Sequence, residues 1–572
     1  MRLNIVKSKN AEQLYIIKSI RKDGKSTTRI MRKLGTMASL LPKFDNDRDK
    51  VIAWAKEEAI KMTAAENSGN ICVDVTFTED RQLDSGKQYC FNIGYLFPKM
   101  ICRQLNLDKI SSNISEQHKI SYSLSDVLQM LITTRLIAPA SKLSSYEYAS
   151  KFLQQPAFDL QHVYRSLDVL SQHSDEIQSA VYENSRKLID RNKEVLFYDC
   201  TNYFFEIEEG RGIAQYGKSK EHRPNPIVQM GLFLDGDGFP LCFSMFPGNQ
   251  NEQPTLKPLE KKILRDFNLS EFIVCTDAGL ASTENRKFNA ISGRSYIVTQ
   301  SLKTLKDFLR EWALDPNGWK LNGSDKLYNI NEIDRQLHKN SIFCKERWIN
   351  ENGLEQRLIV SYSVKEHNYQ RAIRERQIAR AEKIVKEGFK SANRNQNSPK
   401  RFVSETRVTS DGEVADKKIL SLDIDKIELE ERFDGFYAVC TTLENDISEI
   451  IHINKMRWQI EAAFRTMKSE FKARPVYLRN DDRINAHFLT CFLSLLVLKI
   501  IEKKIGGKYS EEQILHTLRD MSVYHLRDIG YLSSYTRTEI TDALHDAFGF
   551  RTDSEFISEK TMKKILRTVE KG

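Results

Sequence analysis

Two stretches decide the fold, Glu194-Val-Leu-Phe-Tyr-Asp199 and Phe272-Ile-Val-Cys-Thr-Asp277. Each is a short apolar run, rich in β-branched and aromatic residues, and such runs are typical of buried strands. Each run ends on an aspartate. An isolated aspartate after a strand is usually a turn or capping residue. Two of them, both at the ends of buried strands, also fit a pair of carboxylates that holds a hard divalent cation.

The segments around these two runs alternate between strand and helix patterns. Ile227–Leu234 and Phe239–Phe246 flank the turn Asp235-Gly-Asp-Gly238, which predicts a hairpin. A helical zone, the run at 272–276, a second helical zone and a strand over Tyr296–Thr299 follow. An RNase H-like core uses this order of elements. We therefore predict an α/β fold with an RNase H-like mixed sheet and flanking helices.

A third stretch, Arg457-Trp-Gln-Ile-Glu461-Ala-Ala-Phe-Arg465-Thr-Met-Lys468, lies in a helical pattern that we expect to run from about Asp446 to Phe471. The spacings of three and four place its charged residues on one helix face. Spacing alone favours a ladder of ion pairs on a solvated surface. Apolar residues on another side anchor this helix against a core; they are Met456, Ile460, Ala463 and Met467.

Together these residues resemble the DDE transposases of bacterial insertion sequences, in the group with a Tyr-x2-Arg-x3-Glu-x6-Lys signature. Arg457, Glu461 and Lys468 match that spacing, and Asn454 stands at the tyrosine position. The similarity covers most of the chain, from the N-terminal hairpin to beyond His487. Further similar pieces are Asp199 with Thr201-Asn202, Lys218-Ser-Lys-Glu-His-Arg223, Pro247-Gly-Asn249 with Glu252, Thr276-Asp277-Ala-Gly279 and Arg474-Pro-Val-Tyr477.

The resemblance implies a DDE transposase that cleaves DNA at insertion-sequence ends and transfers the strand to target DNA. Asp199, Asp277 and Glu461 are then the catalytic residues and the ligands of two Mg²⁺ ions, for which Mn²⁺ is a substitute. In this arrangement Asp199 bridges both ions, and the other two carboxylates complete one site each. No covalent protein–DNA intermediate is required.

The resemblance also implies DNA contacts and partners. Arg457 and Lys468 would hold phosphates beside the scissile bond. The other expected contacts are Arg465 on the same helix face and Lys220, His222 and Arg223 in a basic loop between the first two sheet strands. The expected partners are double-stranded DNA, both terminal inverted repeats and target, and a second copy of the chain in a synaptic homodimer.

The order of patterns divides the chain into six parts. The interval between Asp277 and Glu461 is far longer than one crossover requires, and the material within it looks foreign to the sheet. The predicted parts are a basic β-hairpin region (1–50), a mainly helical N-terminal DNA-binding region (51–190), the first part of the catalytic core (191–304), a β-rich insertion with a basic helix (305–445), the second part of the core with the Glu461 helix (446–505) and a C-terminal helical region (506–572).

Charge is unevenly distributed. The 87 Lys and Arg exceed the 78 Asp and Glu by 9 in 572 residues. Residues 1–50 carry 13 basic and 5 acidic side chains, a net charge of +8. Such a segment is either a solvated hairpin or a surface that binds phosphates. The basic stretch 371–401 leaves the same two alternatives open, a solvated helix or a contact to the DNA backbone.

Composition narrows the class of protein further. Aromatic residues make up 10% of the chain, which excludes global disorder. The nine cysteines form no Cys-x-x-Cys pair, so we expect reduced thiols and no common zinc framework. Met1–Lys7 lacks the apolar core of a secretory signal, and Phe488–Ile501 is interrupted by Lys499 and predicts a buried helix. We expect no membrane association and a cytoplasmic bacterial protein, nucleoid-associated when bound to DNA.

Two alternatives to an active transposase stay open. A catalytically silent relative would bind DNA as a regulator, although the three carboxylates argue against it. An RNase H-like nuclease without strand transfer would share the same residues.

Overall fold

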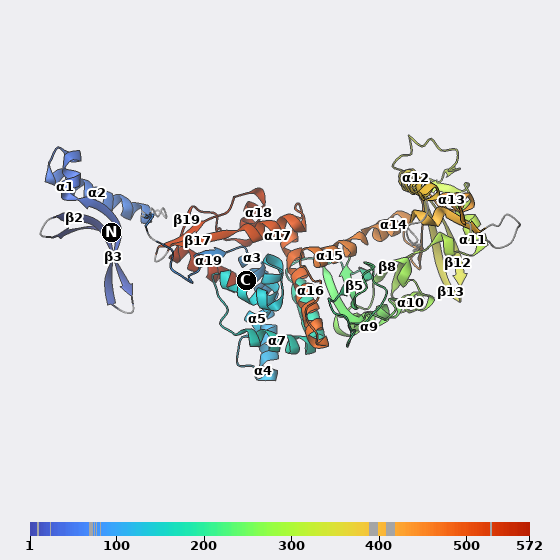
Figure 1. Ribbon diagram of the computed structural model, residues 1–572, viewed down its shortest axis with the longest axis horizontal. Coiled ribbons are helices and arrows are strands. Elements are labelled where there is room, and N and C mark those ends of the chain that lie inside the picture. The colour runs from blue at the N-terminus through green and yellow to red at the C-terminus, as the bar shows by residue number, and fades with distance from the viewer. Residues whose placement is uncertain are drawn as a thin grey trace. The chain divides into compact units, whose positions relative to one another are not determined.

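The computed structural model describes residues 1–8, 11–22, 25–67, 73, 75, 77–80, 82–387, 398–407, 418–526 and 529–572. Two compact units are formed by the chain. The first comprises Met1–Phe97, Ser150–Gln155 and His516–Lys571, and the second comprises Pro98–Ala149, Pro156–Leu515 and Gly572. Figure 1 labels the helices and strands of both.

A ten-stranded mixed sheet forms the centre of the second unit, in the order β11-β10-β12-β13-β16-β9-β8-β5-β6-β7. The last five strands of that order are β9 (Ser295–Thr299), β8 (Ile273–Thr276), β5 (Val195–Phe204), β6 (Ile227–Asp235) and β7 (Pro240–Pro247). β5 is parallel to β8 and antiparallel to β6, and β8 is parallel to β9. This is the RNase H-like arrangement that the sequence predicts, hairpin β6–β7 included.

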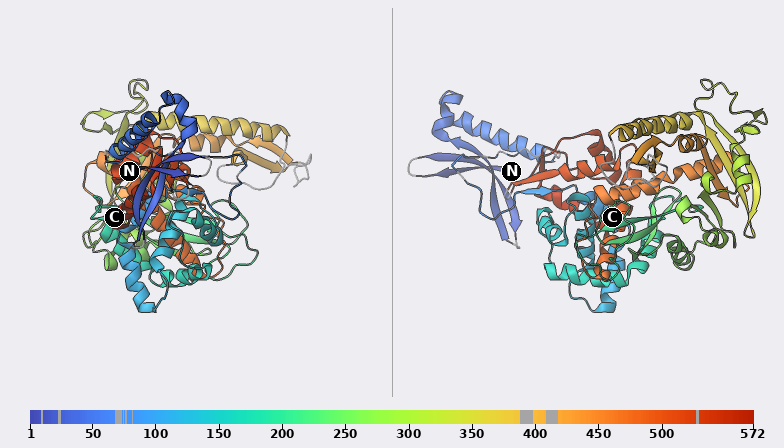
Figure 2. Two further views of the ribbon diagram at one scale, coloured as in Figure 1. Left: turned by 90° about the vertical axis from the view of Figure 1, so that its left-hand side faces the viewer. Right: turned by 45° about the vertical axis from the view of Figure 1, so that its right-hand side comes forward.

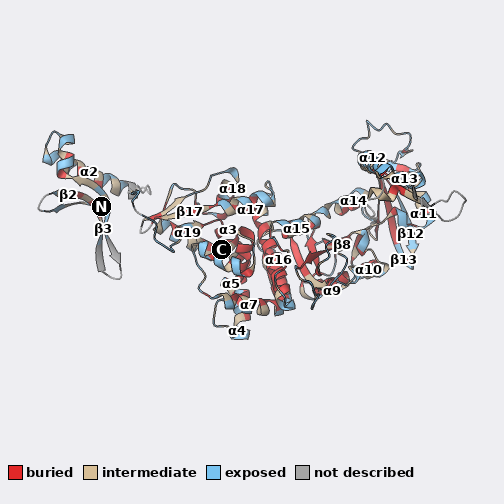
Figure 3. Ribbon diagram, viewed as in Figure 1, coloured by how far each residue is buried: buried red, intermediate tan, exposed pale blue. Residues whose placement is uncertain are grey.

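The two faces of this sheet follow from the alternation of side chains along β5. Leu196, Tyr198 and Cys200 enter a core with α8 (Ser174–Ser185) and α9 (Leu256–Asp266). Residues of the other parity, Asp199 among them, point to the opposite face. There the ring of Tyr203 packs, tilted, against Phe488 of α16 (Asp481–Lys504), with ring centroids 4.6 Å apart. Figure 3 shows β5 and α16 as largely buried.

The insertion extends the sheet instead of standing apart from it, which corrects the expectation that 305–445 is foreign to the sheet. β16 (Phe436–Thr441) pairs with β9, and β13 (Leu354–Ser363) pairs with β16. Local sequence carries no sign of this long-range pairing. The other elements are α10 (Thr283–Phe288), α11 (Asp307–Leu314), β10 (Trp319–Leu321), β11 (Leu327–Tyr328), β12 (Ile342–Glu351), α12 (Val364–Glu387), β14 (Val403–Arg407), β15 (Lys418–Leu422) and α13 (Ile424–Glu431).

The basic helix predicted within 371–401 is α12, and residues 388–397 of that stretch lie outside the described residues. The single helix predicted for 446–471 is two helices. α14 (Ile447–Met456) and α15 (Trp458–Ser469) meet at Arg457, which caps both. Arg457 keeps helical dihedral angles, so its side chain still precedes Glu461 by about one turn.

The helices before β5 form a layer beside α16. In it α5 (Leu124–Ile137), α7 (Leu160–Gln172) and α8 pack against α16, and α4 (Leu107–His118) and α6 (Lys142–Tyr148) pack on those helices. α16 contains the predicted buried helix at 488–501. By length and hydropathy it resembles a membrane span, yet 89% of its most apolar window is buried inside the protein, as in the core helix of a folded domain.

The N-terminal residues of the first unit form a three-stranded antiparallel sheet, β1 (Arg2–Lys7), β2 (Glu12–Lys22) and β3 (Lys25–Thr36). The predicted β2–β3 hairpin is confirmed, and its turn at 23–24 lies outside the described residues. α1 (Met37–Leu40) and α2 (Arg48–Asn67) follow, and their apolar side chains join Leu14 in a small core. Figure 2 shows α2 beside these strands.

A second sheet in the first unit joins both ends of the chain. β4 (Cys90–Asn92) pairs with β17 (Ser522–Leu526), followed by β18 (Gly530–Ser533) and β19 (Phe556–Ser558). The predicted helical region 506–572 therefore also contains three strands, and it does not fold apart from the N-terminal part. These strands are short and pair at long range, so no local pattern indicates them. The helices are α3 (Leu96–Gln104), α17 (Glu511–Asp520), α18 (Glu539–Phe548) and α19 (Glu559–Lys571).

Candidate active site

Asp199 and Asp277 are brought together by strand register. In the parallel pair β5–β8, Phe197 lies opposite Cys275. Each aspartate follows two residues later, so both lie at equivalent positions where β8 ends. β5 itself continues to Phe204, opposite β6. Asp199 therefore lies within a strand, and the prediction that it ends one is wrong because pairing with β6 keeps β5 extended.

The surroundings of Asp199 disfavour its charge. Burial, and to a smaller degree the neighbouring carboxylate of Asp277, raise the pKa of Asp199 to about 6, although Lys220 and Arg457 act in the opposite direction. The backbone N–H of Cys200 donates to Oδ1 of Asp199 at 2.7 Å. A cation between the carboxylates of Asp199 and Asp277 would relieve the repulsion between them.

Asp277 begins a short 3₁₀ turn, Ala278–Leu280. Its Oδ1 accepts the backbone N–H of Leu280 at 3.2 Å, which orients the carboxylate. The capping role that sequence assigns to an aspartate after a strand is thus present, together with the proximity to Asp199. Capping and metal binding are compatible, since a carboxylate has lone pairs on both oxygens.

Glu461 lies on α15, which covers the sheet face that carries Asp199. Its side chain is 55% exposed, and its Oε1 forms an ion pair with Nη1 of Arg457 at 3.6 Å. Both residues line a cavity of about 710 Å³, together with Trp458 and Tyr437. Among the described residues, Glu461 does not join the two aspartates in a group whose ligand atoms all lie within 4.8 Å. The structure thus assembles two of the three predicted carboxylates and places the third on the adjacent helix.

Asn454 occupies the tyrosine position of the signature. It is 6% exposed, and its Nδ2 donates to the hydroxyl of Tyr437 at 2.9 Å. That hydroxyl also bonds to Oγ1 of Thr299 at 2.7 Å. A tyrosine hydroxyl therefore does lie near this position, supplied by strand β16 instead of helix α14. The spacing of the signature misses it because Tyr437 lies outside the signature, on a different element.

Lys468 faces inward from α15. Burial, with a contribution from Lys220, lowers its pKa to about 8. Its Nζ lies 3.4 Å from Oε1 of Glu221, which also pairs with Arg474. Glu221 thus links the Glu461 helix to the basic loop, and sequence analysis did not single it out.

Lys220 is the member of the basic loop nearest to the aspartates. Its Nζ pairs with Glu252 at 3.0 Å and donates to the carbonyl oxygen of Cys200, next to Asp199. Burial lowers the pKa of Lys220, but Asp199 and Glu252 outweigh burial and the net shift is upward. Glu252, part of one of the similar pieces in the sequence, is therefore a further acidic residue at this site, and its contact with Lys220 appears only in the folded chain.

The remaining predicted DNA contacts are exposed. His222 and Arg223 project from the loop, and Arg465 projects from α15. The guanidinium of Arg223 lies 4.2 Å from the ring centroid of Phe204, at the end of β5. These positions leave the three side chains accessible to a polyanion.

The donor set at Asp199 and Asp277 fits a hard divalent cation. Both ligands are carboxylates; burial is the main cause of the raised pKa of Asp199, and the nearby carboxylate of Asp277 adds to it. Oxygen ligands are those that Mg²⁺ prefers, and one or two carboxylates are sufficient when substrate phosphates and waters complete the shell. Glu461 is the third ligand that the sequence predicts.

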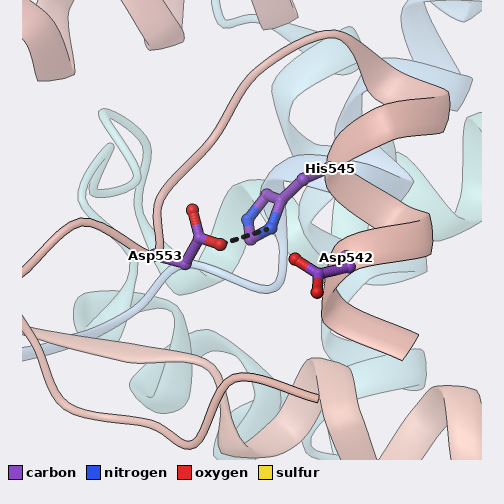
Figure 4. Close-up of side chains that lie close together, drawn as sticks. All are labelled: Asp542, His545 and Asp553. Carbon is purple, nitrogen blue, oxygen red and sulfur yellow. Dashed lines mark ion pairs between the residues drawn. The ribbon is translucent and has the colours of Figure 1, made fainter. Parts of the chain in front are cut away.

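A different group of side chains, Asp542, His545 and Asp553, satisfies the distance criterion for a metal site (Figure 4). Arg551 already pairs with both carboxylates, at 2.7 Å to Asp553. The backbone N–H of Thr552 donates to Nε2 of His545 at 3.2 Å, which leaves the proton of the neutral ring on Nδ1, facing Asp553. The potential metal-binding nitrogen is thus protonated, and the cluster is a compensated ion-pair network.

Comparison with known proteins indicates the family of the chain. Residues 204–497 match the Transposase DDE domain family. Among solved structures, the chain is similar to piggyBac transposase in a synaptic complex with hairpin DNA (7% identity, 83% of this chain and 84% of that chain, TM-score 0.32). It is also similar to Marinitoga piezophila Argonaute in complex with 5′ OH guide RNA and target DNA (9% identity, 65% and 67%, TM-score 0.15). No curated protein matches the chain.

These two structural similarities are too low to carry an argument, so the assignment rests on the family match. The matched segment includes Asp277, Arg457, Glu461 and Lys468, and it begins shortly after Asp199. It spans more than half of the 572 residues. The chain belongs to the family of transposases with a DDE domain.

Proposed function

We propose that this transposase cleaves DNA at the ends of an insertion sequence and transfers the cut strands to target DNA. The observation that carries the proposal is the placement of Asp199 on β5 and Asp277 directly after β8, each two residues beyond the paired residues Phe197 and Cys275. In a transposase, two carboxylates on adjacent strands are suited to phosphodiester chemistry. Glu461 on α15 would complete the acidic set when DNA is bound.

Transposases of this family generally use divalent metal ions. Asp199, Asp277 and Glu461 would hold two Mg²⁺ ions here, with Mn²⁺ as a substitute. When bound, such ions polarise the scissile phosphate and lower the pKa of an attacking water. The protein's own contribution is to hold the carboxylates close together where β8 ends and to present cations to the flanking phosphates.

The basic residues would position the strand. Lys468 and Arg457 lie on either side of Glu461 along α15 and would contact phosphates beside the scissile bond. Charged hydrogen bonds to phosphate are strong and, for arginine, directional. Lys220, His222, Arg223 and Arg465 would contact the same DNA further along.

We further propose that both element ends are held by a homodimer, and that the protein acts in the cytoplasm of a bacterium, on the nucleoid. Two ends must be cut and joined in concert, and each catalytic domain has one acidic set. These points rest on the proposed reaction.

A strand-transfer assay tests the proposal. Purified full-length protein, a DNA that carries both ends of the element, Mg²⁺ and a target plasmid should yield plasmids with joined ends. The control omits the ends, and no joined product should then form. Cleavage without joining would indicate a nuclease, whereas DNA binding without cleavage would indicate a regulator; either result contradicts the proposal.

A further inference from the structure

A cavity of about 420 Å³ lies on the second unit, and Arg474 is the residue that it shares with the candidate active site. It is bounded by the end of α5, the start of α6, the segment 472–478 that follows α15, and α16. Its basic lining residues are Arg135, Lys142, Lys472, Arg474 and His487, and the cavity has no acidic lining residue within the described part of the chain.

Two of these cations are deeply buried without a counter-charge in the cavity. Lys142 is 4% exposed, and its Nζ has no hydrogen-bond partner. Arg135 is 2% exposed; its Nη1 donates to the carbonyl oxygen of Phe471 at 3.0 Å, and its Nε has no partner. Both statements hold for the part of the chain that the structure describes.

The neighbouring groups do not neutralise this charge. Arg474 pairs with Glu221, whose carboxylate is thereby committed to Arg474 and Lys468. His487 lies 3.2 Å from the carbonyl oxygen of Ala473, and burial, together with Lys142 and Arg135, keeps its pKa well below the usual value. Burial lowers the pKa of Lys142 to about 7, with Arg135 adding to the shift.

A buried cation without a partner is costly, and buried charges in proteins are normally paired. Two adjacent cations in a cavity without acids would be stabilised by an anion from solution. Hydroxyl groups of Ser141, Ser144 and Tyr164 also line the cavity and are donors to oxygen. A phosphate group satisfies both requirements, since it carries negative charge and several acceptor oxygens.

We propose that this cavity binds a phosphate group of the DNA backbone, at a distance along the strand from the cleaved bond. The inference rests on the proposed function, which supplies the DNA. Exposed Lys472 and Tyr477 lie at the rim of the cavity.

The segment that forms this rim is also connected to the catalytic sheet. The backbone N–H of Val476 donates to the carbonyl oxygen of Phe204 at 3.2 Å, at the end of the strand that carries Asp199. A strand that leaves the catalytic carboxylates along 472–478 would therefore reach Lys142.

Binding of a labelled DNA duplex to the full-length protein tests this site over a series of salt concentrations. Lys142→Met should weaken binding about tenfold and reduce the slope of log affinity against log salt by about one. Lys142→Arg should retain the binding. Lys187→Met is the matched control, because it removes the same charge from an exposed position on the second unit and should leave affinity nearly unchanged.

Thermal melting provides the second readout. Inorganic phosphate should raise the melting temperature of the wild-type protein more than chloride does at equal ionic strength. For Lys142→Met, this difference between phosphate and chloride should disappear. A phosphate effect with unchanged DNA affinity would show that the cavity takes a free phosphate, which overturns the proposal for DNA. No phosphate effect on the wild-type protein would overturn the site altogether.

A failure of the phosphate site can be distinguished from a failure of the proposed function. DNA binding that depends on Lys142 in a protein that cannot cut DNA would contradict the proposed reaction and leave the phosphate site supported. Normal cleavage together with unchanged DNA binding by Lys142→Met would support the proposed reaction and contradict the phosphate site.

Discussion

Asp199 of β5 and Asp277 after β8 occupy equivalent positions on adjacent parallel strands, two residues beyond the pair Phe197–Cys275. The parallel register places two carboxylates close together where β8 ends. Burial, and to a smaller degree the carboxylate of Asp277, raise the pKa of Asp199 to about 6. Two buried carboxylates this close together are consistent with a cation site between them.

Replacement of Lys468 tests whether it contacts DNA or only supports the fold. Lys468 is partly buried and shares Glu221 with Arg474. A charged hydrogen bond is worth roughly 1.5–3 kcal/mol, so Lys468→Ala should slow single-turnover cleavage about ten- to hundredfold. A lowered melting temperature with an unchanged cleavage rate would assign Lys468 a structural role instead.

Removal of the Tyr437 hydroxyl should destabilise the junction between β16 and α14. Tyr437→Phe leaves the buried Nδ2 of Asn454 without its 2.9 Å partner, and such a group costs about 1–3 kcal/mol. Denaturant unfolding of the variant should show this loss. Tyr369→Phe is a suitable control, because Tyr369 is 59% exposed; equal stability of both variants would contradict the role of the hydrogen bond.

The basic N-terminal sheet should contribute to DNA binding through charge alone. Arg29 and Lys33 of β3 are exposed. In the full-length protein, each substitution to Ala should lower affinity at low salt and reduce the salt slope by about one. Unchanged salt dependence in the double variant would mean that the sheet is merely solvated.

The stability effect of Lys142 should depend on pH. The pKa of Lys142 is lowered to about 7 in the folded protein, below the ordinary lysine value of 10.5. Between these two pH values the lysine is protonated in the unfolded chain and neutral in the folded protein. The contribution of Lys142 to the free energy of unfolding of the wild-type protein therefore rises with pH across this range. Below pH 7 the full cost of the buried charge is present, at about 1.4 kcal/mol for each unit of pKa shift.

Lys142→Met should thus be more stable than wild type near pH 6 and lose this advantage as pH approaches 10. The other charged or titratable groups around the site are Arg135, His487, Cys491, Arg474, Lys472, Tyr164 and Tyr477. These groups are common to both proteins, so the difference between their unfolding curves isolates residue 142. A difference that does not change with pH would contradict a buried, titrating lysine.

Much of the core could be predicted because its signals are local. The runs before Asp199 and Asp277 are buried strands, the turn at 235–238 joins β6 to β7, and the spacing of Arg457, Glu461 and Lys468 is helical. The hydrophobic sequence at 488–501 also forms the buried helix that its length predicts.

Features that depend on long-range contact could not be predicted. β16 joins the insertion to β9, and β17 pairs with β4 from the other end of the chain. Tyr437 reaches Asn454 only through this pairing. The link from Lys468 to Glu221 likewise exists only after folding, because no periodic pattern connects the two residues.

The most direct test of the central claim is the cleavage rate of element-end DNA in Mg²⁺ by Asp199→Asn, Asp277→Asn and Glu461→Gln. Each substitution keeps side-chain size and removes the charge that holds the cation, so each should abolish cleavage while DNA binding stays nearly intact. The matched control is Glu470→Gln, one residue beyond the end of α15, which should cleave normally. Near-normal cleavage by any one of the three variants would contradict the assignment of Asp199, Asp277 and Glu461 as the catalytic set.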